Sequence, residues 1–368
     1  MHEVIVIGGG IIGSFAAYFL SQFGKRVTLV ERGEIGGQAS GINPGGLNPL
    51  HGSGLPGIMS PLAERAFALN LEHWDRIATL SGIAFDPQRI QRVELAFDEV
   101  EKQALADSLP HYDTIPGFRA RWMERAELLA EDPRIHPQVV GGLWTEGNGM
   151  VSSGAYTRAV ARAAQVQGAR IVHGEVTGLV TQAGKVTGVK AGGAVLNCDA
   201  LIVASGAWTE DAAKWLDCAI PVSPLKGELL LAEMPGAMLK HHVTWKLIGL
   251  YQTPQGPVWL GGTQEKAGFD HAPSEAGRDF ILHAVARLVP EAGEARVIRH
   301  LAALRPVTPD GLPLLGLLAG WENAFLAVGS GPKGMLLGAG MGETVARLIA
   351  GMTPAFALDP YRPQRFNT

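Results

Sequence analysis

The chain has 368 residues, of which 46% are hydrophobic and 18% charged, and its formal net charge at pH 7 is −4. This length corresponds to one large or two medium globular domains, and the composition excludes long disordered stretches. The weakly acidic balance argues against a protein that coats nucleic acid, and no uninterrupted apolar stretch of about 18 residues is long enough to span a membrane.

The first predicted element, an apolar strand at residues 4–7, leads directly into a glycine-rich turn. Gly8, Gly10 and Gly13 form a G-x-G-x-x-G that opens an apolar helix over residues 11–20. Between a strand and a helix this pattern predicts a dinucleotide site. The first glycine permits the tight turn, the second lets backbone N–H groups approach a pyrophosphate, and the third lets helix and strand pack closely. The helix N-terminus adds partial positive charge for the anion.

A second strand at residues 26–30 ends at Glu31. An acidic residue about 20 positions after the glycines is placed to bind the ribose hydroxyls of an adenine dinucleotide. The order of strand, glycines, helix, strand and acidic residue favours this interpretation over a flexible turn beside a surface glutamate. These segments leave the choice between NAD and FAD open, because both cofactors share the same ADP half.

Beyond Glu31, segments typical of α/β folds alternate with segments typical of mixed sheets. The turn-rich residues 36–46 precede a helix at 61–80, and residues 82–149 contain short alternating runs such as residues 93–97. The α/β pattern returns with a helix at 156–167 and strands at 170–172, 176–181, 186–190 and 200–204. Short strands then surround a helix near 274–288, and the chain closes with a strand at 324–328 and a helix at 334–350.

We therefore expect an α/β fold in which a Rossmann-like nucleotide-binding domain is interleaved with an α+β substrate domain on a mixed, largely antiparallel sheet. The nucleotide domain would comprise residues 1–81, 150–220 and 301–368, and the substrate domain residues 82–149 and 221–300. This interleaving is unlike a plain NAD dehydrogenase, whose dinucleotide fold is usually one contiguous block.

Two later segments carry small residues at the ends of apolar strands. Residues 204–208 follow the buried strand at 200–204, and small residues there let a large cofactor approach the sheet. Residues 329–334 form a second glycine-rich turn, and the helix that follows presents a second partial positive charge. Directed at the pyrimidine edge of a flavin, this charge would stabilise the reduced cofactor. The alternative is that Gly331 and Gly334 serve only helix packing.

In four separated blocks the chain resembles the D-amino-acid oxidase-like flavoproteins, a family that includes glycine oxidases, D-amino acid dehydrogenases and sarcosine oxidases. The blocks are residues 8–31, residues 38–46, residues 204–208, and residues 305–316 with 329–338. Residues 359–366 also resemble the P-x-R-F that ends chains of this family. The resemblance covers nearly all of the chain and implies FAD as the cofactor.

The resemblance assigns residues to the cofactor by position. Ala39 and Ser40 would lie along the pyrophosphate, Val176 would contact the adenine, and residues 331–336 would surround the isoalloxazine. Ser205, Gly206 and Trp208 would lie beside the sugar chain. The full set of expected cofactor-binding residues is Gly8, Gly10, Ile11, Ile12, Gly13, Glu31, Arg32, Ala39, Ser40, Gly46, Leu47, Val176, Ser205, Gly206, Trp208, Gly331, Lys333, Gly334, Met335 and Leu336.

Two departures from the family concern the flavin itself. Members of the sarcosine oxidase branch attach the flavin to a cysteine just upstream of the Thr-Pro-Asp segment. Here residues 303–305 (Ala-Leu-Arg) occupy that region, so we expect non-covalent FAD. Ser330 stands where many members carry histidine or an aromatic residue, which implies different contacts at the flavin edge.

For the substrate, Arg305 matches the family arginine that grips a carboxylate, and Tyr251 resembles the tyrosine that helps to hold it. A planar guanidinium can pair with a carboxylate through two parallel hydrogen bonds. The alternatives are an interdomain salt bridge for Arg305 and a water-exposed hydroxyl for Tyr251. The implied reaction is oxidation of a small amino acid or secondary amine to an imine, by hydride transfer to flavin N5, and hydrolysis to the oxo acid.

This chemistry depends more on alignment than on a dedicated base, and the sequence offers no His/Asp or paired-carboxylate constellation. His51, His241 and His242 are candidates only by residue type. The expected electron acceptor is oxygen or a redox partner. One alternative is a flavoprotein subunit of a multi-component dehydrogenase that passes electrons to a partner or quinone.

A weaker alternative is an RNA-modifying flavoprotein, because residues 39–50 faintly resemble the oxidase domain of a bifunctional tRNA-modifying enzyme. The negative net charge argues against it, and we expect no nucleic-acid partner.

Cys198 and Cys218 have no His or Cys at metal-ligand spacing, so no metal is expected. They form either a disulfide or, as we expect for a cytoplasmic chain without a signal peptide, two reduced thiols. Homo-oligomers and peripheral membrane contact stay open.

Overall fold

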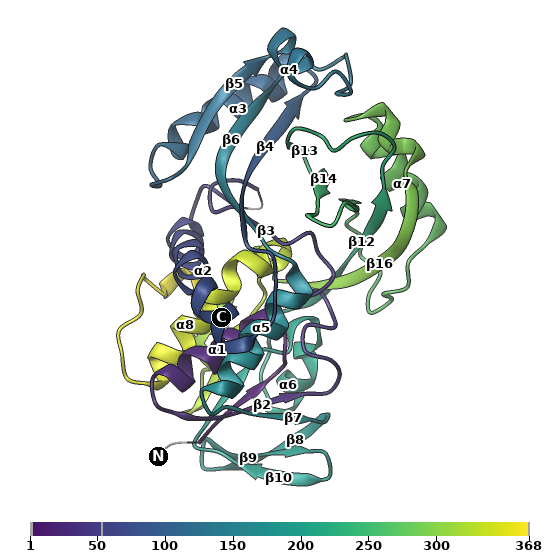
Figure 1. Ribbon diagram of the computed structural model, residues 1–368. Coiled ribbons are helices and arrows are strands. Elements are labelled where there is room, and N and C mark those ends of the chain that lie inside the picture. Colours follow the sequence, from purple (N-terminus) through teal and green to yellow (C-terminus); the bar gives the residue numbers. More distant parts are fainter. Residues whose placement is uncertain (1–2, 53, 367–368) are drawn as a thin grey trace.

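The computed structural model describes residues 3–52 and 54–366. Its strands form a six-stranded sheet, a nine-stranded sheet and a small three-stranded sheet (Figure 1). The helices are α1 (Ile11–Gln22), α2 (Ser60–Ser81), α3 (Glu99–Tyr112), α4 (Arg125–Glu131), α5 (Ser153–Val166), α6 (Thr209–Trp215), α7 (Glu275–Ala286) and α8 (Gly334–Ile349). The strands are β1 (Glu3–Ile7), β2 (Arg26–Glu31), β3 (Gly46–Leu47), β4 (Gln88–Ala96), β5 (Arg119–Glu124), β6 (Gly141–Met150), β7 (Arg170–His173), β8 (Val176–Gln182), β9 (Lys185–Ala191), β10 (Ala194–Asn197), β11 (Ala200–Val203), β12 (Ser223–Glu233), β13 (His242–Trp245), β14 (Ile248–Gln252), β15 (Val258–Gly261), β16 (Arg296–Val307), β17 (Leu314–Leu317) and β18 (Ala324–Val328).

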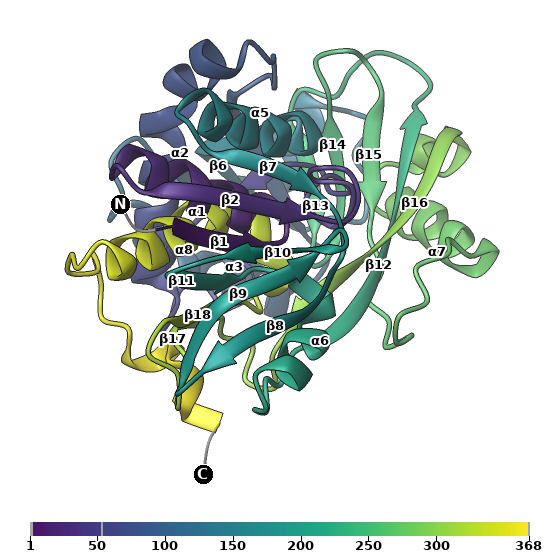
Figure 2. The same cartoon turned by 90° about the horizontal axis from the view of Figure 1, so that it is seen from below.

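The six-stranded sheet has the order β17-β18-β11-β1-β2-β7 and is parallel except for the β17–β18 pair. Helices α1, α2, α5 and α8 pack together on one face, and β8–β10 with α6 cover the other (Figure 2). Both faces are therefore buried, which explains why β1 and β11 are continuous apolar runs. The connections from β1 to its two parallel neighbours leave a crevice at the carboxyl ends of these strands, which is where open α/β sheets bind their ligands.

The nine-stranded sheet has the order β16-β12-β15-β14-β13-β4-β6-β3, with β5 paired to β6. Among the neighbouring strand pairs of this sheet, β13 and β4 are parallel to each other, and every other pair is antiparallel. An apolar cluster that includes Val93, Leu95, Leu128 and Ile281 joins one face to α4 and α7. The expected architecture of a Rossmann-like unit with a mixed, largely antiparallel second sheet is thus confirmed.

The division into five segments stays a prediction. The six-stranded sheet takes its strands from residues 3–31, 170–203 and 314–328, whereas the nine-stranded sheet uses residues 46–47, 88–150 and 223–307. Strand β16 runs through the expected boundary at residue 301.

Residues 82–149, expected as a mixed or antiparallel sheet, also contain α3 and α4. In α3 only Tyr112 is buried, so the helix lacks the apolar stripe that marks most surface helices. A local signal was present: Asp98 accepts a hydrogen bond from Glu101 N at 2.8 Å, and Glu101 accepts one from Phe97 N at 2.9 Å. This reciprocal arrangement resembles a capping box.

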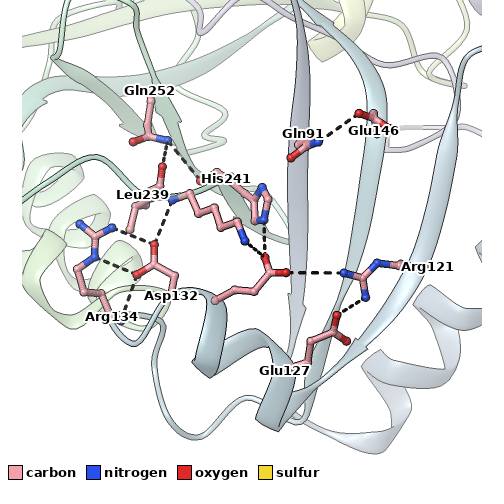
Figure 3. A network of polar contacts seen from close by, with 11 residues as sticks. Gln91, Arg121, Glu127, Asp132, Arg134, Glu146, Leu239, His241 and Gln252 are labelled. Carbon is pink, nitrogen blue, oxygen red and sulfur yellow. Dashed lines mark hydrogen bonds and ion pairs between the residues drawn. The ribbon is translucent and has the colours of Figure 1, made fainter.

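A polar network ties the end of α4 to the segment before β13 (Figure 3). The Asp132 carboxylate, 5% exposed, accepts bonds from Arg134 Nε and Nη2, both at 2.9 Å, and from Lys240 N at 3.2 Å. Burial alone would raise the pKa of Asp132, but these hydrogen bonds lower it overall. Nearby, Glu131 pairs with His241 at 3.0 Å.

We expect Asp132→Ala to lower the free energy of unfolding by about 1.5–3 kcal/mol, because Arg134 and the Lys240 backbone N–H lose their charged hydrogen-bond acceptor. The matched control is Glu127→Gln in the same network (Figure 3), which breaks an exposed ion pair with Arg121. Such pairs contribute roughly 0–1 kcal/mol. Urea denaturation of both variants measures the difference; equal losses would contradict the assignment.

Within residues 3–52 and 54–366, no helix has the length and apolar character needed to cross a membrane. The same described residues contain no cluster of three or more His, Cys, Asp or Glu side chains suited to a metal. Cys198 and Cys218 are free thiols, so the reduced alternative describes this structure.

Candidate active site

A cavity of about 420 Å³ lies between the carboxyl ends of the six-stranded sheet and one face of the nine-stranded sheet. Every residue that the sequence assigns to cofactor or substrate lines it, with the exception of Gly13. Segments that are far apart in the chain, such as residues 8–12, 204–208 and 330–336, therefore meet around one space.

The glycine-rich turn after β1 is too crowded for side chains. Gly8 has φ +107°, and a Cβ there would lie 2.4 Å from Ala204 O. A Cβ on Gly13 would lie 1.9 Å from Gly8 O. Gly13 thus serves the close packing of α1 on the turn, which is why it does not reach the cavity. Gly10 is the N-cap of α1 and does line the cavity.

Glu31 is held rigidly at the tip of β2. Its two carboxylate oxygens accept hydrogen bonds from Gly9 N at 2.6 Å and Gly33 N at 2.8 Å. A carboxylate oxygen can accept more than one hydrogen bond, so the remaining lone pairs are available to hydroxyl groups in the cavity. Gly9 was not singled out from the sequence, although it orients the acidic residue.

Ser40 is fixed against the N-terminus of α1, where its Oγ accepts a hydrogen bond from Ile11 N at 3.0 Å. At the Glu31 end of the cavity, the Arg32 guanidinium lies over the Trp208 ring, 4.7 Å from its centroid. This cation–π contact joins the first βα unit to the segment after β11. Val176 lines the same cavity.

The second glycine-rich turn precedes α8, which begins at Gly334 as expected. Gly331 has φ +55°, a left-handed conformation that favours glycine. Helix packing is carried by later glycines: a Cβ on Gly338 would lie 2.9 Å from Ile11, and one on Gly342 would lie 2.6 Å from Phe15. The glycines at the turn and those that pack the helix are therefore different residues.

Lys333 points its ammonium group at the loop after β3. Its Nζ donates to Asn48 O at 3.3 Å and to His51 O. Burial, together with the positive charge of Arg92, lowers the pKa of Lys333 to about 7, against the opposing effect of Glu94. The charge at this point of the cavity thus changes near neutral pH.

Arg305 lies on β16 and extends across the neighbouring strand. Its Nη1 donates to Thr263 O at 3.0 Å, and no carboxylate of the described residues forms an ion pair with it. Burial lowers the pKa of Arg305, but a guanidinium stays protonated in proteins. The interdomain salt bridge considered from the sequence is absent from residues 3–52 and 54–366, which leaves an unneutralised cation inside the cavity.

Gly227 on β12 makes room for this guanidinium. A Cβ at residue 227 would lie 2.1 Å from Arg305 Nη1 and 2.3 Å from Cζ. The sequence carries no signal for this role, because it arises from the pairing of β12 with β16.

We expect Gly227→Ala to raise KM for the substrate by about tenfold, since overpacking costs about 1–3 kcal/mol and here displaces the guanidinium. Steady-state turnover at varied substrate concentration, with oxygen or an artificial electron acceptor, measures it. The control is Gly178→Ala on β8, where a Cβ meets nothing closer than 3.6 Å. An unchanged KM in Gly227→Ala would show that the position of the guanidinium does not matter.

Tyr251 on β14 folds its ring over Gly249, where a Cβ would lie 2.4 Å from the ring. Burial and the charge of Glu94 raise the pKa of Tyr251, although Arg92 opposes this effect. The hydroxyl therefore stays protonated and can donate a hydrogen bond to an anion in the cavity.

Of the three histidines, only His51 lines the cavity, and its Nε2 lies 2.8 Å from Glu94 Oε2. His241 pairs with Glu131 in the network of Figure 3. Burial, with Arg92 and His241 nearby, lowers the pKa of His242 to about 4. The cavity also contains Arg92, Glu94 and Asn48, which the sequence analysis did not single out.

The cavity fits an adenine dinucleotide through its Cβ-free turn, its helix N-terminus and the fixed Glu31 carboxylate. A family model described as FAD dependent oxidoreductase matches residues 3–348. The chain belongs to this family. The cofactor is therefore FAD, as expected. Non-covalent attachment stays a prediction.

Characterised members of the family are similar over nearly their whole length. Glycine oxidase from Pseudomonas aeruginosa is 29% identical over 374 residues, covering 98% of each chain. D-amino acid dehydrogenase from Xanthobacter autotrophicus is 27% identical and covers 96% of each. The crystal structure of glycine oxidase from Geobacillus kaustophilus superposes with a TM-score of 0.91 at 27% identity, covering 99% of each chain.

Proposed function

We propose that the protein oxidises a small amino acid or secondary amine to the imine, which hydrolyses to the oxo acid. The observation that carries this proposal is the unneutralised Arg305 guanidinium, which shares one cavity with the FAD-binding turn. A substrate carboxylate would supply its missing counterion. The names of the similar oxidases and dehydrogenases support the same substrate class.

In this proposal Arg305 and Tyr251 bind the carboxylate and fix the α-carbon, since orientation can supply much of the rate enhancement. FAD, when bound, supplies the hydride acceptor. The substrate must carry a neutral amine, and transfer from water into the cavity lowers the pKa of that amine. The α-carbon loses a hydride and the nitrogen a proton; water then adds to the imine and releases ammonia or an amine.

The residues proposed for the cofactor divide by position along the cavity. Glu31, Arg32 and Val176 would hold the adenosine, and the turn with Ser40 the pyrophosphate. Ser205, Gly206 and Trp208 would lie beside the sugar chain of the flavin. Residues 331–336 would lie at the flavin.

We further propose a cytoplasmic protein, because its two free thiols suit a reducing compartment.

Anaerobic mixing of the purified flavoprotein with glycine, sarcosine, D- and L-amino acids and 2-hydroxy acids tests the function. Bleaching of the flavin by one or more of the amines is expected. Bleaching by 2-hydroxy acids alone, or by no compound, would overturn the proposal. Readmission of oxygen then separates an oxidase from a dehydrogenase that requires a redox partner.

Carboxylate binding should be pH-dependent because of Lys333. Below pH 7 its ammonium is charged, so affinity for acetate is expected to rise about tenfold between pH 8 and pH 6, the order expected for one added charge in a partly buried site. Lys333→Met should flatten this dependence. Perturbation of the flavin spectrum by acetate measures it, and an unchanged slope in the variant would assign the effect elsewhere.

A further inference from the structure

A second guanidinium, that of Arg92 on β4, lines the same cavity from a strand farther along the nine-stranded sheet. Along β4, Ile90, Arg92 and Glu94 face the cavity, whereas Val93 and Leu95 face the apolar cluster beneath α4 and α7. Arg92 is only 9% exposed. Its position is set by strand alternation, not by a flexible loop.

Arg92 is a buried cation whose charge the described chain neutralises only in part. Its Nε and Nη2 form no hydrogen bond of good geometry within residues 3–52 and 54–366, and the neutral hydroxyl of Tyr112 lies beside the guanidinium. The nearest counterion is Glu94, with Oε2 at 3.4 Å from Nη2, but the same oxygen lies closer to His51 Nε2, at 2.8 Å. A buried guanidinium that shares its only nearby carboxylate with a histidine is incompletely neutralised, which points to an anionic ligand in the cavity as a further partner.

Below pH 7, where Lys333 is protonated, the charges at this end of the cavity do not balance around a ligand with one carboxylate. Arg305, Arg92 and Lys333 are then all cationic, against the single carboxylate of Glu94. Lys246 also lines the cavity, but it is paired with Glu101 at 2.7 Å. One carboxylate on Arg305 leaves Arg92 and Lys333 to share Glu94, whereas two carboxylates bring the site close to neutrality.

The two arginines lie on opposite sides of Tyr251. In the strand order, β16 with Arg305 is separated from β4 with Arg92 by four strands, and β14 with Tyr251 lies between them. An α-carboxylate on Arg305 and Tyr251 would therefore leave the rest of the substrate directed toward Arg92.

From this arrangement we propose that the substrate carries a second anionic group, on its side chain or on its nitrogen, and that Arg92 binds it. The inference rests on the proposed function, because it takes Arg305 as the site of the first carboxylate. It narrows the substrate class from small amino acids and amines to amino acids with a second acidic group.

The test uses two non-reacting ligands of equal length on the holoenzyme. Glutarate has two carboxylates, and its monoamide glutaramate has one. Perturbation of the flavin spectrum should give a dissociation constant about 10- to 100-fold lower for glutarate, the ratio expected for a charged hydrogen bond. In Arg92→Met this ratio should fall to about threefold or less. Arg89→Met, the same change at an exposed position of β4, should retain it.

If Arg92→Met does not fold because Glu94 loses its partner, the double variant Arg92→Met/Glu94→Gln removes both charges and should also lose the ratio. Equal binding of the two ligands by the wild type, or an unchanged ratio in whichever variant folds, overturns the inference.

Reduction of the flavin by glutamate and by glutamine in the anaerobic assay distinguishes failure of the proposed function from failure of the second anion site. If no amine reduces the flavin, the proposed function fails; if both reduce it equally well, only the second anion site fails.

Discussion

Replacement of Arg305 by methionine is expected to lower kcat/KM for the substrate by roughly 30- to 5,000-fold. Truncation of one partner of a buried charge pair costs about 2–5 kcal/mol, and here the substrate carboxylate would be the partner left without a counterion. Among residues 3–52 and 54–366, Arg305 donates only to Thr263 O, so removal of the guanidinium leaves no buried carboxylate of these residues unpaired. The loss should therefore appear in catalysis and not in folding.

Anaerobic flavin reduction at varied substrate concentrations measures this effect, with thermal unfolding as the check on the fold. Arg299→Met is the matched control, because Arg299 is an exposed residue of the same strand. Arg305→Lys should recover only part of the activity, since an ammonium cannot reproduce two parallel hydrogen bonds. Unchanged kinetics in Arg305→Met would exclude this residue from carboxylate binding.

The nucleotide-binding half could be predicted from the sequence because its signals are local. Gly8, Gly10 and Gly13 follow an apolar strand directly, and Glu31 ends the next one. Each feature has a steric or electrostatic reason at its own position. Strand β18 and the start of α8 at Gly334 were predicted to the residue for the same reason.

The side of the cavity formed by β4 and β12 of the nine-stranded sheet could not be predicted from local signals. Arg92 and Glu94 alternate with Val93 and Leu95, a pattern that is the same whether the polar face meets water or an enclosed cavity. Only the position of β4 over the carboxyl ends of the parallel sheet distinguishes the two. Gly227 is a further example, since its role depends on Arg305, which is 78 residues further along the chain.

Substrate residues were reached by family resemblance and not by pattern. Nothing near Arg305 or Tyr251 in the sequence marks a carboxylate site; their side chains converge because β16 and β14 belong to one sheet. The resemblance therefore supplied the position, whereas the structure supplies the physical reason: an arginine without a counterion in a cavity.

Gly8→Ala is expected to yield protein that is largely free of flavin. Gly8 has φ +107°, and the added Cβ would lie 2.4 Å from Ala204 O and 2.8 Å from Ala204 C. Backbone strain of about 1–3 kcal/mol adds to an overpacking cost of about 1–3 kcal/mol. Both fall on the turn that meets the cofactor, so the dissociation constant for FAD should rise by roughly 30-fold or more.

The ratio of flavin to protein after purification, and titration of the apoprotein with FAD, measure this effect. Gly168→Ala separates its two causes, because Gly168 has a similar φ of +103° but open space around its Cβ position. That variant should lose some stability and retain FAD. If Gly8→Ala binds FAD as tightly as Gly168→Ala does, the collision with Ala204 has no effect on the cofactor, and the close approach of β1 and β11 is not what shapes the site.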